Sequence, residues 1–263
     1  MSGTLIASLE SLGLSSLADL FSKNSPGSVL LTRLASLASD SKLQEWIDAI
    51  SWPQIGQGLI STLLMLVISV LFTVIIGLPL GILLYLSSPG QLLQNRPLYA
   101  VLSFVVNILR SVPFIILMIV AFPLTKLIVG TTIDVQGAIP PLVFAAAPFF
   151  ARLVETSLRE VDRGVIEASQ AMGASRTQIV LRVLLPESRS GLIAAVTITA
   201  VNLVSYTAMA GAVGAGGLGD LAIRFGYYGF QPGILLVTVV ILVILVQVLQ
   251  TLGDFFVRRY IRK

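Results

Sequence analysis

Few side chains in this sequence could carry covalent or metal chemistry. Cysteine and histidine are both absent, which excludes disulfides, thiol chemistry and histidine-based metal or acid–base sites. The glycine-rich stretch at residues 214–219 matches the G-x-G-x-x-G pattern of dinucleotide-binding loops. That pattern binds a cofactor only after a strand and within a βαβ unit, whereas here it follows an apolar segment. We therefore reject this interpretation and expect the glycines to allow tight packing or bending of the backbone.

A nucleotide-hydrolysing site is not expected either. The sequence contains no G-x-x-x-x-G-K-[ST] pattern, which is the loop that cradles nucleotide phosphates in P-loop ATPases. We predict that the chain by itself is not an enzyme and that it holds no cofactor or metal.

The composition predicts a membrane protein. Of 263 residues, 56% are hydrophobic and 11% are charged, whereas about a quarter are charged in a typical soluble domain. An apolar run of about 20 residues can cross the hydrocarbon core of a bilayer as a helix. We therefore predict an all-α polytopic fold with five transmembrane helices, at residues 59–86, 99–124, 138–153, 192–213 and 234–255.

Residues 1–56 differ from the membrane domain that we place at residues 57–263. They are rich in serine and leucine, with short apolar patches and scattered charges. We expect an N-terminal extension, either with short amphipathic helices at the membrane surface or poorly ordered. A basic stretch followed by an apolar core is missing, so we expect no cleaved signal peptide.

The basic residues predict the orientation of the chain in the membrane. Lys and Arg are enriched in cytoplasmic loops, and the net charge of +4 is better explained by this topology than by nucleic-acid binding. Five such residues lie on the side that we predict to be external: Lys23, Arg33, Lys42, Lys126 and Arg224. Eleven lie on the side that we predict to be cytoplasmic: Arg96, Arg152, Arg159, Arg163, Arg176, Arg182, Arg189, Arg258, Arg259, Arg262 and Lys263. This places the N-terminus outside and the C-terminus in the cytoplasm, with membrane lipid around the spans.

A long polar loop, residues 152–189, separates the third and fourth predicted spans. Residues 155–171 can form one helix, which Gly173 would end because glycine tolerates the left-handed conformation. Ser175 and Gln178 have the spacing of a capping box that starts a second helix, and Pro186 would close it. Two helices around a tight turn could fill a groove on a partner. The alternative is an ordinary amphipathic loop on the lipid surface.

The spacing within this loop resembles the EAA loop of ABC importer permeases, which docks into the ATPase subunit. Ser169 and Val183 depart slightly from the family pattern, which usually has Ala and Ile there. The resemblance implies that Glu167, Ala168 and Gly173 contact the ATPase, while Arg176 and Arg182 could instead bind lipid phosphates. The residues that match the motif are Glu167, Ala168, Ser169, Gly173, Val183, Leu185 and Pro186.

The rest of the chain resembles the permeases of methionine ABC importers from about residue 54 to residue 263. The matching segments are residues 77–81 (GLPLG), 107–114 (NILRSVPF), 146–149 (AAPF) and 208–219 (AMAGAVGAGGLG). The resemblance implies a homodimer in the bacterial inner membrane that imports methionine. An ABC ATPase dimer would use the ATP, and an external substrate-binding protein would deliver the substrate. The alternatives are an ABC permease for another amino acid or a small osmolyte, and a secondary transporter driven by an ion gradient.

Candidate pathway residues lie within the predicted spans. Arg110 falls inside the second span, where a charged side chain must face protein or water, or reach the membrane surface. It could contact substrate or act in gating, or form a structural pair with a loop carboxylate such as Glu155 or with a helix C-terminus. An apolar path suits methionine, and the candidate gate residues for it are Phe149, Phe150, Met209 and Val213.

Overall fold

The structure is a computed structural model that describes residues 50–260 of the chain. The predicted amphipathic helices of the N-terminal extension lie outside the described residues. The same holds for five of the basic residues used to predict the orientation: Lys23, Arg33, Lys42, Arg262 and Lys263.

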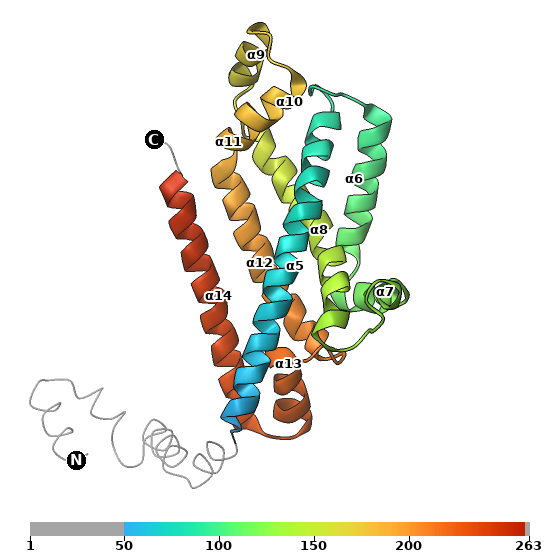
Figure 1. The fold of residues 1–263 in the computed structure, drawn as a ribbon, viewed down its shortest axis with the longest axis vertical. Coiled ribbons are helices and arrows are strands. Elements are labelled where there is room, and N and C mark those ends of the chain that lie inside the picture. Colours follow the sequence, from blue (N-terminus) through green and yellow to red (C-terminus); the bar gives the residue numbers. More distant parts are fainter. Residues whose placement is uncertain (1–49, 261–263) are drawn as a thin grey trace, which may run out of the picture.

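Within residues 50–260 every regular element is helical, and four helices are long and apolar enough to cross a membrane. The four are α5 (Trp52–Ser87), α8 (Asp134–Arg159), α12 (Arg189–Gly211) and α14 (Pro232–Tyr260), which run along the long axis of the molecule (Figure 1). A bent pair, α6 (Arg96–Ser111) and α7 (Phe114–Val129), raises the number to five if it counts as one span. The predicted all-α polytopic class is confirmed.

The second predicted span, residues 99–124, is not one continuous helix. Helices α6 and α7 are bent by 112° relative to each other, and α7 is seen nearly end-on in Figure 1, whereas α6 follows the long axis. The break falls at Val112 and Pro113, whose ψ angles of 127° and 135° are extended. Proline disfavours the helical conformation of the residue before it and donates no backbone hydrogen bond. This local effect explains why an apolar stretch of sufficient length is interrupted.

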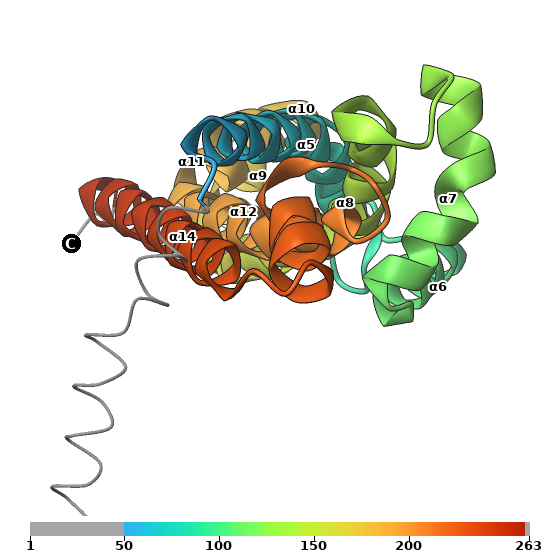
Figure 2. The ribbon, with the colours of Figure 1, turned by 90° about the horizontal axis from the view of Figure 1, so that it is seen from below.

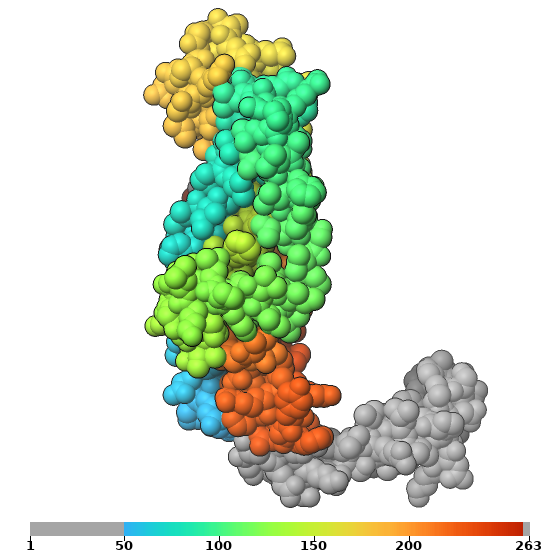
Figure 3. All heavy atoms as spheres, turned by 90° about the vertical axis from the view of Figure 1, so that its right-hand side faces the viewer, coloured from blue at the N-terminus to red at the C-terminus, as the bar shows by residue number. Residues whose placement is uncertain are grey.

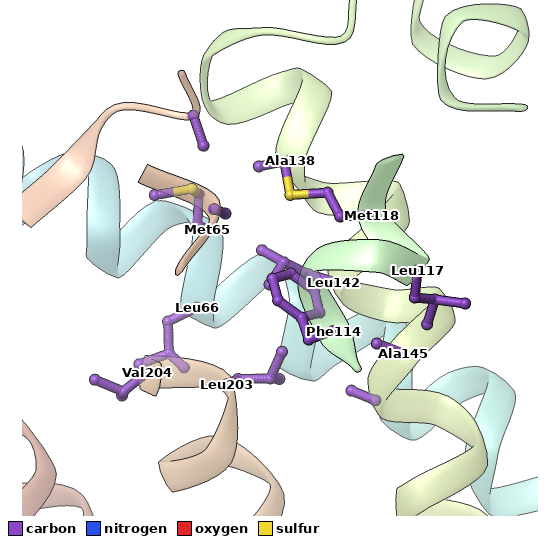
Figure 4. Close-up of a cluster of buried hydrophobic side chains, with 13 residues drawn as sticks. Met65, Leu66, Phe114, Leu117, Met118, Ala138, Leu142, Ala145, Leu203 and Val204 are labelled. Atoms are coloured by element: carbon purple, nitrogen blue, oxygen red, sulfur yellow. The ribbon is translucent and has the colours of Figure 1, made fainter. Parts of the chain in front are cut away.

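Helix α7 is held in the bundle by a buried apolar cluster (Figure 4). Phe114 and Met118 of α7 are at most 7% exposed and lie among side chains of α5, α8 and α12. The ring of Phe114 also stacks on Tyr206 of α12, with 4.5 Å between the centroids. The transverse helix is therefore an integral part of the core. Figure 2 shows α6 and α7 together at one side of the bundle.

Two glycines that flank the turn after α12 pack against backbone with no space for a side chain. A Cβ at Gly219 would lie 2.4 Å from the backbone of Ala208, and one at Gly211 would lie 2.3 Å from the nitrogen of Asp220. The turn leads into α13 (Gly217–Asp220) and a π-helical segment, η2 (Leu221–Tyr228). The backbone N–H of Leu218 donates to Thr62 Oγ1 of α5 over 2.9 Å. Tight packing at this turn is confirmed, and a helix precedes it, which agrees with our rejection of a dinucleotide site.

The polar loop and the C-terminal end of α14 lie at one end of the molecule, while α13 and the start of α5 lie at the other (Figure 1). The loop contains α9 (Arg163–Ala171), α10 (Arg176–Ile179), the π-helical segment η1 (Val180–Leu184) and α11 (Leu185–Glu187). Figure 3 shows its α9 and α10 region as a projection beyond the helical body. The start of α5 and the end of α14 thus lie at opposite ends of the molecule, so the chain between residues 52 and 260 passes from one end to the other an odd number of times.

The close packing of Gly219 generates a stability prediction. We expect Gly219→Val to lower the thermal midpoint of the purified protein strongly, because forcing extra atoms into a packed site costs about 1–3 kcal/mol or more. Gly56→Ala is the control, since a Cβ at this helical position would meet nothing within 4 Å. It should leave the midpoint unchanged or raise it slightly. Equal midpoints for Gly219→Val and the parent would contradict the packing described above.

Candidate functional site

The polar loop begins with a break that the sequence interpretation missed. The prediction of one helix over residues 155–171 is wrong, because α8 ends at Arg159 and α9 starts at Arg163. Asp162 caps the new helix by accepting a hydrogen bond from Gly164 N over 2.6 Å. An N-cap aspartate satisfies one of the free donors at the start of a helix. The loop helix α9 can therefore point in its own direction instead of extending α8.

The predicted turn at Gly173 is confirmed. Gly173 has φ +80°, a conformation that is costly for residues with a Cβ. Its N–H donates to Gln170 O over 2.9 Å, and Ala174 N donates to Ser169 O over 3.1 Å. These two bonds form a Schellman motif, which satisfies carbonyls at the end of α9.

The predicted capping box is also confirmed. Gln178 N donates to Ser175 Oγ over 3.3 Å, while Ser175 N donates to Gln178 Oε1 over 2.8 Å. The second half of the loop then runs through α10, η1 and α11 as one nearly continuous helical stretch. Its break before α12 falls at Ser188 rather than at Pro186, because proline is tolerated in the first turn of α11.

The residues that match the loop motif divide into two groups. Glu167, Ala168, Gly173 and Pro186 are exposed and are available to a partner. The others support the loop from inside. Ser169 is buried and donates to Val165 O over 2.8 Å, and Val183 and Leu185 pack against the apolar cluster that joins the loop to α5 and α8.

The two most exposed large apolar side chains of the loop were missed by the sequence interpretation. Met172 is 80% exposed beside the turn and Leu181 is 59% exposed. Methionine adapts its shape readily and recurs at binding surfaces. The signal in the sequence was an apolar residue directly before Gly173 and another inside a polar stretch. Arg176 and Arg182 are also exposed on this loop.

The candidate pathway residues are only partly brought together. The guanidinium carbon of Arg110 lies 5.6 Å from the ring centroid of Phe149, within the range of a cation–π interaction. Met209, at the end of α12, is 47% exposed, and Val213 packs against the central cluster. Phe150 is 1% exposed among core residues, so its proposed place in a gate is wrong for this conformation. Neighbouring residues of a helix point in different directions. Phe150 therefore faces the interior, while Phe149 contacts Arg110.

The suggested pair between Arg110 and Glu155 is wrong. Glu155 forms its ion pairs with Arg152 and Arg159, at 2.5 Å and 2.6 Å. These arginines are neighbours of Glu155 on α8, one turn before it and one turn after it, and such neighbours meet without any tertiary contact. Arg110, near the end of α6, packs on Phe149 instead.

Comparison with known proteins agrees with this geometry. Residues 77–263 match the family model described as the binding-protein-dependent transport system inner membrane component. A "Probable D-methionine transport system permease protein MetI" of Vibrio cholerae is 52% identical over 184 residues, covering 70% of this chain and 82% of the relative. A "Methionine import system permease protein MetP" of Bacillus subtilis is 47% identical over 172 residues, covering 65% and 78%.

Solved structures show the same fold. A chain of the MetNI methionine ABC transporter, in an inward-facing conformation, is 50% identical with a TM-score of 0.79. The match covers 81% of this chain and 100% of that one. An amino acid ABC transporter chain that is 19% identical matches with a TM-score of 0.65, which concerns the fold alone. The chain thus belongs to the family of binding-protein-dependent transport system inner membrane components.

Proposed function

We propose that the chain is the permease subunit of an ABC importer that carries methionine into the cell. A separate ATPase subunit would power the transport, and an external binding protein would supply the substrate. The observation that carries the proposal is the projecting loop α9–α11, in which the exposed members of the motif are Glu167, Ala168, Gly173 and Pro186. The assignment of methionine is supported by relatives named for methionine transport at 47–52% identity.

The working unit is a homodimer on a pair of ATPase subunits. One chain offers one loop, whereas an ATPase pair offers two equivalent grooves, so two copies related by a twofold axis satisfy both. The ATPase cycle would then be coupled to transport by a difference in the affinity of the two permease states for the ATPase pair. The outward-facing state must bind the closed ATPase pair more tightly than the inward-facing state does. Closure of the ATPases would bring the two loops together and open the external side.

The proposed contact between the loop and the ATPase also implies an orientation of the chain in the membrane. A loop that binds a cytoplasmic ATPase must lie in the cytoplasm, and the C-terminal end of α14 lies at the same end of the molecule. The start of α5 then lies at the external face. The arginines of the loop and of the end of α14 agree with this orientation.

Membership of a binding-protein-dependent family leaves two alternatives to methionine as the substrate: another amino acid or a small osmolyte. Such a permease would keep the same loop and would be fed by a different binding protein. Substrate competition separates these candidates, while dependence on the ATPase separates both from a transporter driven by an ion gradient.

We predict that cells lacking their own high-affinity importer will accumulate labelled methionine when given this chain with its cognate ATPase and binding protein. Unlabelled methionine should compete better than other amino acids or betaine-type osmolytes. The control is an ATPase variant that binds but does not hydrolyse ATP, which should abolish accumulation. ATP-dependent uptake best competed by another solute would reject methionine, and uptake without the ATPase would reject the importer itself.

The charge at Glu167 generates a second prediction. We expect Glu167→Lys to lower methionine uptake by at least about tenfold, because a central interface contact is worth about 2 kcal/mol or more. The permease should still insert and remain monodisperse, since Glu167 is exposed. Glu160→Lys is the matched control, as it makes the same charge change at an exposed position before α9. Normal uptake by Glu167→Lys would rule out this contact.

The turn at Gly173 predicts that two substitutions at this position will differ in their effect on methionine uptake. Gly173→Asn should keep most of the uptake, because asparagine tolerates a positive φ. Gly173→Pro should lose it, since proline cannot adopt φ +80° and removes the N–H that donates to Gln170 O. Co-purification of the ATPase with each variant measures the effect directly. Equal co-purification by the two variants would contradict a role for this turn.

A further inference from the structure

Helix α8 carries a buried carboxylate near its cytoplasmic end. The side chain of Glu155 is 2% exposed, and its two oxygens accept from Arg152 Nη1 over 2.5 Å and from Arg159 Nη2 over 2.6 Å. A buried charge is tolerated only when partners and hydrogen bonds compensate its lost hydration. All three charged groups belong to α8, so this compensation does not require another helix.

Helix α6 presents a matching stripe of polar side chains. Tyr99, Ser103 and Asn107 are spaced four residues apart and therefore share one face of the helix. Tyr99 OH donates to Glu155 Oε1 over 3.3 Å, and Arg152 Nη2 donates to Ser103 Oγ over 2.9 Å and to Asn107 Oδ1 over 2.8 Å. We call these six residues the polar zipper: Tyr99, Ser103 and Asn107 of α6, with Arg152, Glu155 and Arg159 of α8.

Apolar packing of α6 within the chain involves one buried residue and a few half-buried ones, Leu102 and Leu109 among them. Among the described residues of α6, Val106 alone is buried. Much of the remaining apolar surface points away from the body, as in Val101 and Phe104, which are 62% and 65% exposed. The zipper is therefore a major part of what fixes α6 against α8. Hydrogen bonds also set the register of two helices more sharply than apolar contacts do, because they are directional.

The two ends of the zipper lie next to two different parts of the chain, the polar loop and the break between α6 and α7. Arg159 is the last residue of α8, directly before the turn that Asp162 closes to start α9. Asn107 lies one turn before the break at Val112 and Pro113, where α6 leads into the transverse helix α7. Helix α7 in turn stacks Phe114 on Tyr206 of α12. A continuous series of contacts thus runs from the ATPase-facing loop to the middle of the bundle.

We propose that the polar zipper transmits displacement of the loop α9–α11 to the broken helix α6/α7, and that Tyr99, Ser103, Asn107 and Arg152 are positioning residues for transport. The inference rests on the proposed function, since it takes the loop to be the ATPase contact. Glu155 and Arg159 hold Arg152 and Tyr99 in place. When the end of α8 moves with the loop, α6 moves with it as one unit.

The test removes the link from the α6 side only. In the variant Tyr99→Phe/Ser103→Ala/Asn107→Leu the ion pairs of Glu155 within α8 remain, so no buried charge loses its partner. The complex of permease and ATPase, reconstituted in vesicles with binding protein and methionine, should assemble and hydrolyse ATP. Methionine imported per ATP hydrolysed should fall by about tenfold, because the variant removes the four hydrogen bonds that join α6 to Arg152, Glu155 and Arg159 of α8. Ser111→Ala is the matched control, because its Oγ donates to the carbonyl of Asn107 within α6.

A second readout separates transmission from mere stabilisation. The chain contains no cysteine, so a cysteine placed at Ile108, which is 46% exposed on α6, would be the only thiol in the permease. In the parent complex its labelling rate should change when ATP and vanadate close the ATPase pair. In the triple variant this response should be lost, although the complex is assembled. Should the triple variant assemble poorly, Tyr99→Phe alone decides the question by the same two measurements.

An unchanged coupling ratio together with a preserved labelling response in the assembled variant would overturn the inference while leaving the importer function intact. Absence of ATP-driven uptake in the parent complex would overturn the proposed function, and the inference with it.

Discussion

Helices α5 and α8 approach each other closely because glycines of α5 face the backbone of α8. A Cβ at Gly81 would lie 2.6 Å from the carbonyl oxygen of Ala151, and one at Gly77 would lie 2.9 Å from that of Ala147. In a bilayer, helices gain little from burying apolar side chains against each other, so close van der Waals contact through small residues takes over that role. The other helices are arranged around this pair. Helix α7 packs on its middle, and the loop packs on the end of the pair that carries Tyr85 of α5 and Leu158 of α8.

The same constraint explains where polar groups are found. Backbone and charged groups have no water partners in the hydrocarbon region, so each must be satisfied within the protein. Glu155 is compensated by two arginines of its own helix, and the remaining donors of Arg152 reach across to α6. The break at Pro113 is tolerated because Phe114 and its neighbours are buried in the central cluster. Polar or irregular features thus occur where protein, rather than lipid, surrounds them.

The loop shows which features can be predicted from residues that are neighbours in the sequence and which cannot. The turn at Gly173 and the capping box of Ser175 and Gln178 depend on hydrogen bonds between near neighbours, and both were predictable from residue type and spacing. The start of α9 was equally local, because Asp162 is a strong N-cap residue, but the charge pattern over residues 155–171 masked it. Which motif residues are exposed was not predictable. Ser169 is adjacent to Ala168, yet only Ser169 packs against the body of the protein.

The sequence by itself determined the membrane class, the approximate spans, the loop and its motif, because hydrophobic length, glycine and capping residues act within one or two helical turns. Tertiary structure decided the partner of Arg110, the interior position of Phe150 and the transverse course of α7. It also decided which residues of α6 and α8 form hydrogen bonds with each other. Those of α6 are Tyr99, Ser103 and Asn107, and those of α8 are Arg152 and Glu155. Those contacts depend on how closely and at what rotation helices pack. That packing is set by small residues distant in sequence, which no local pattern records.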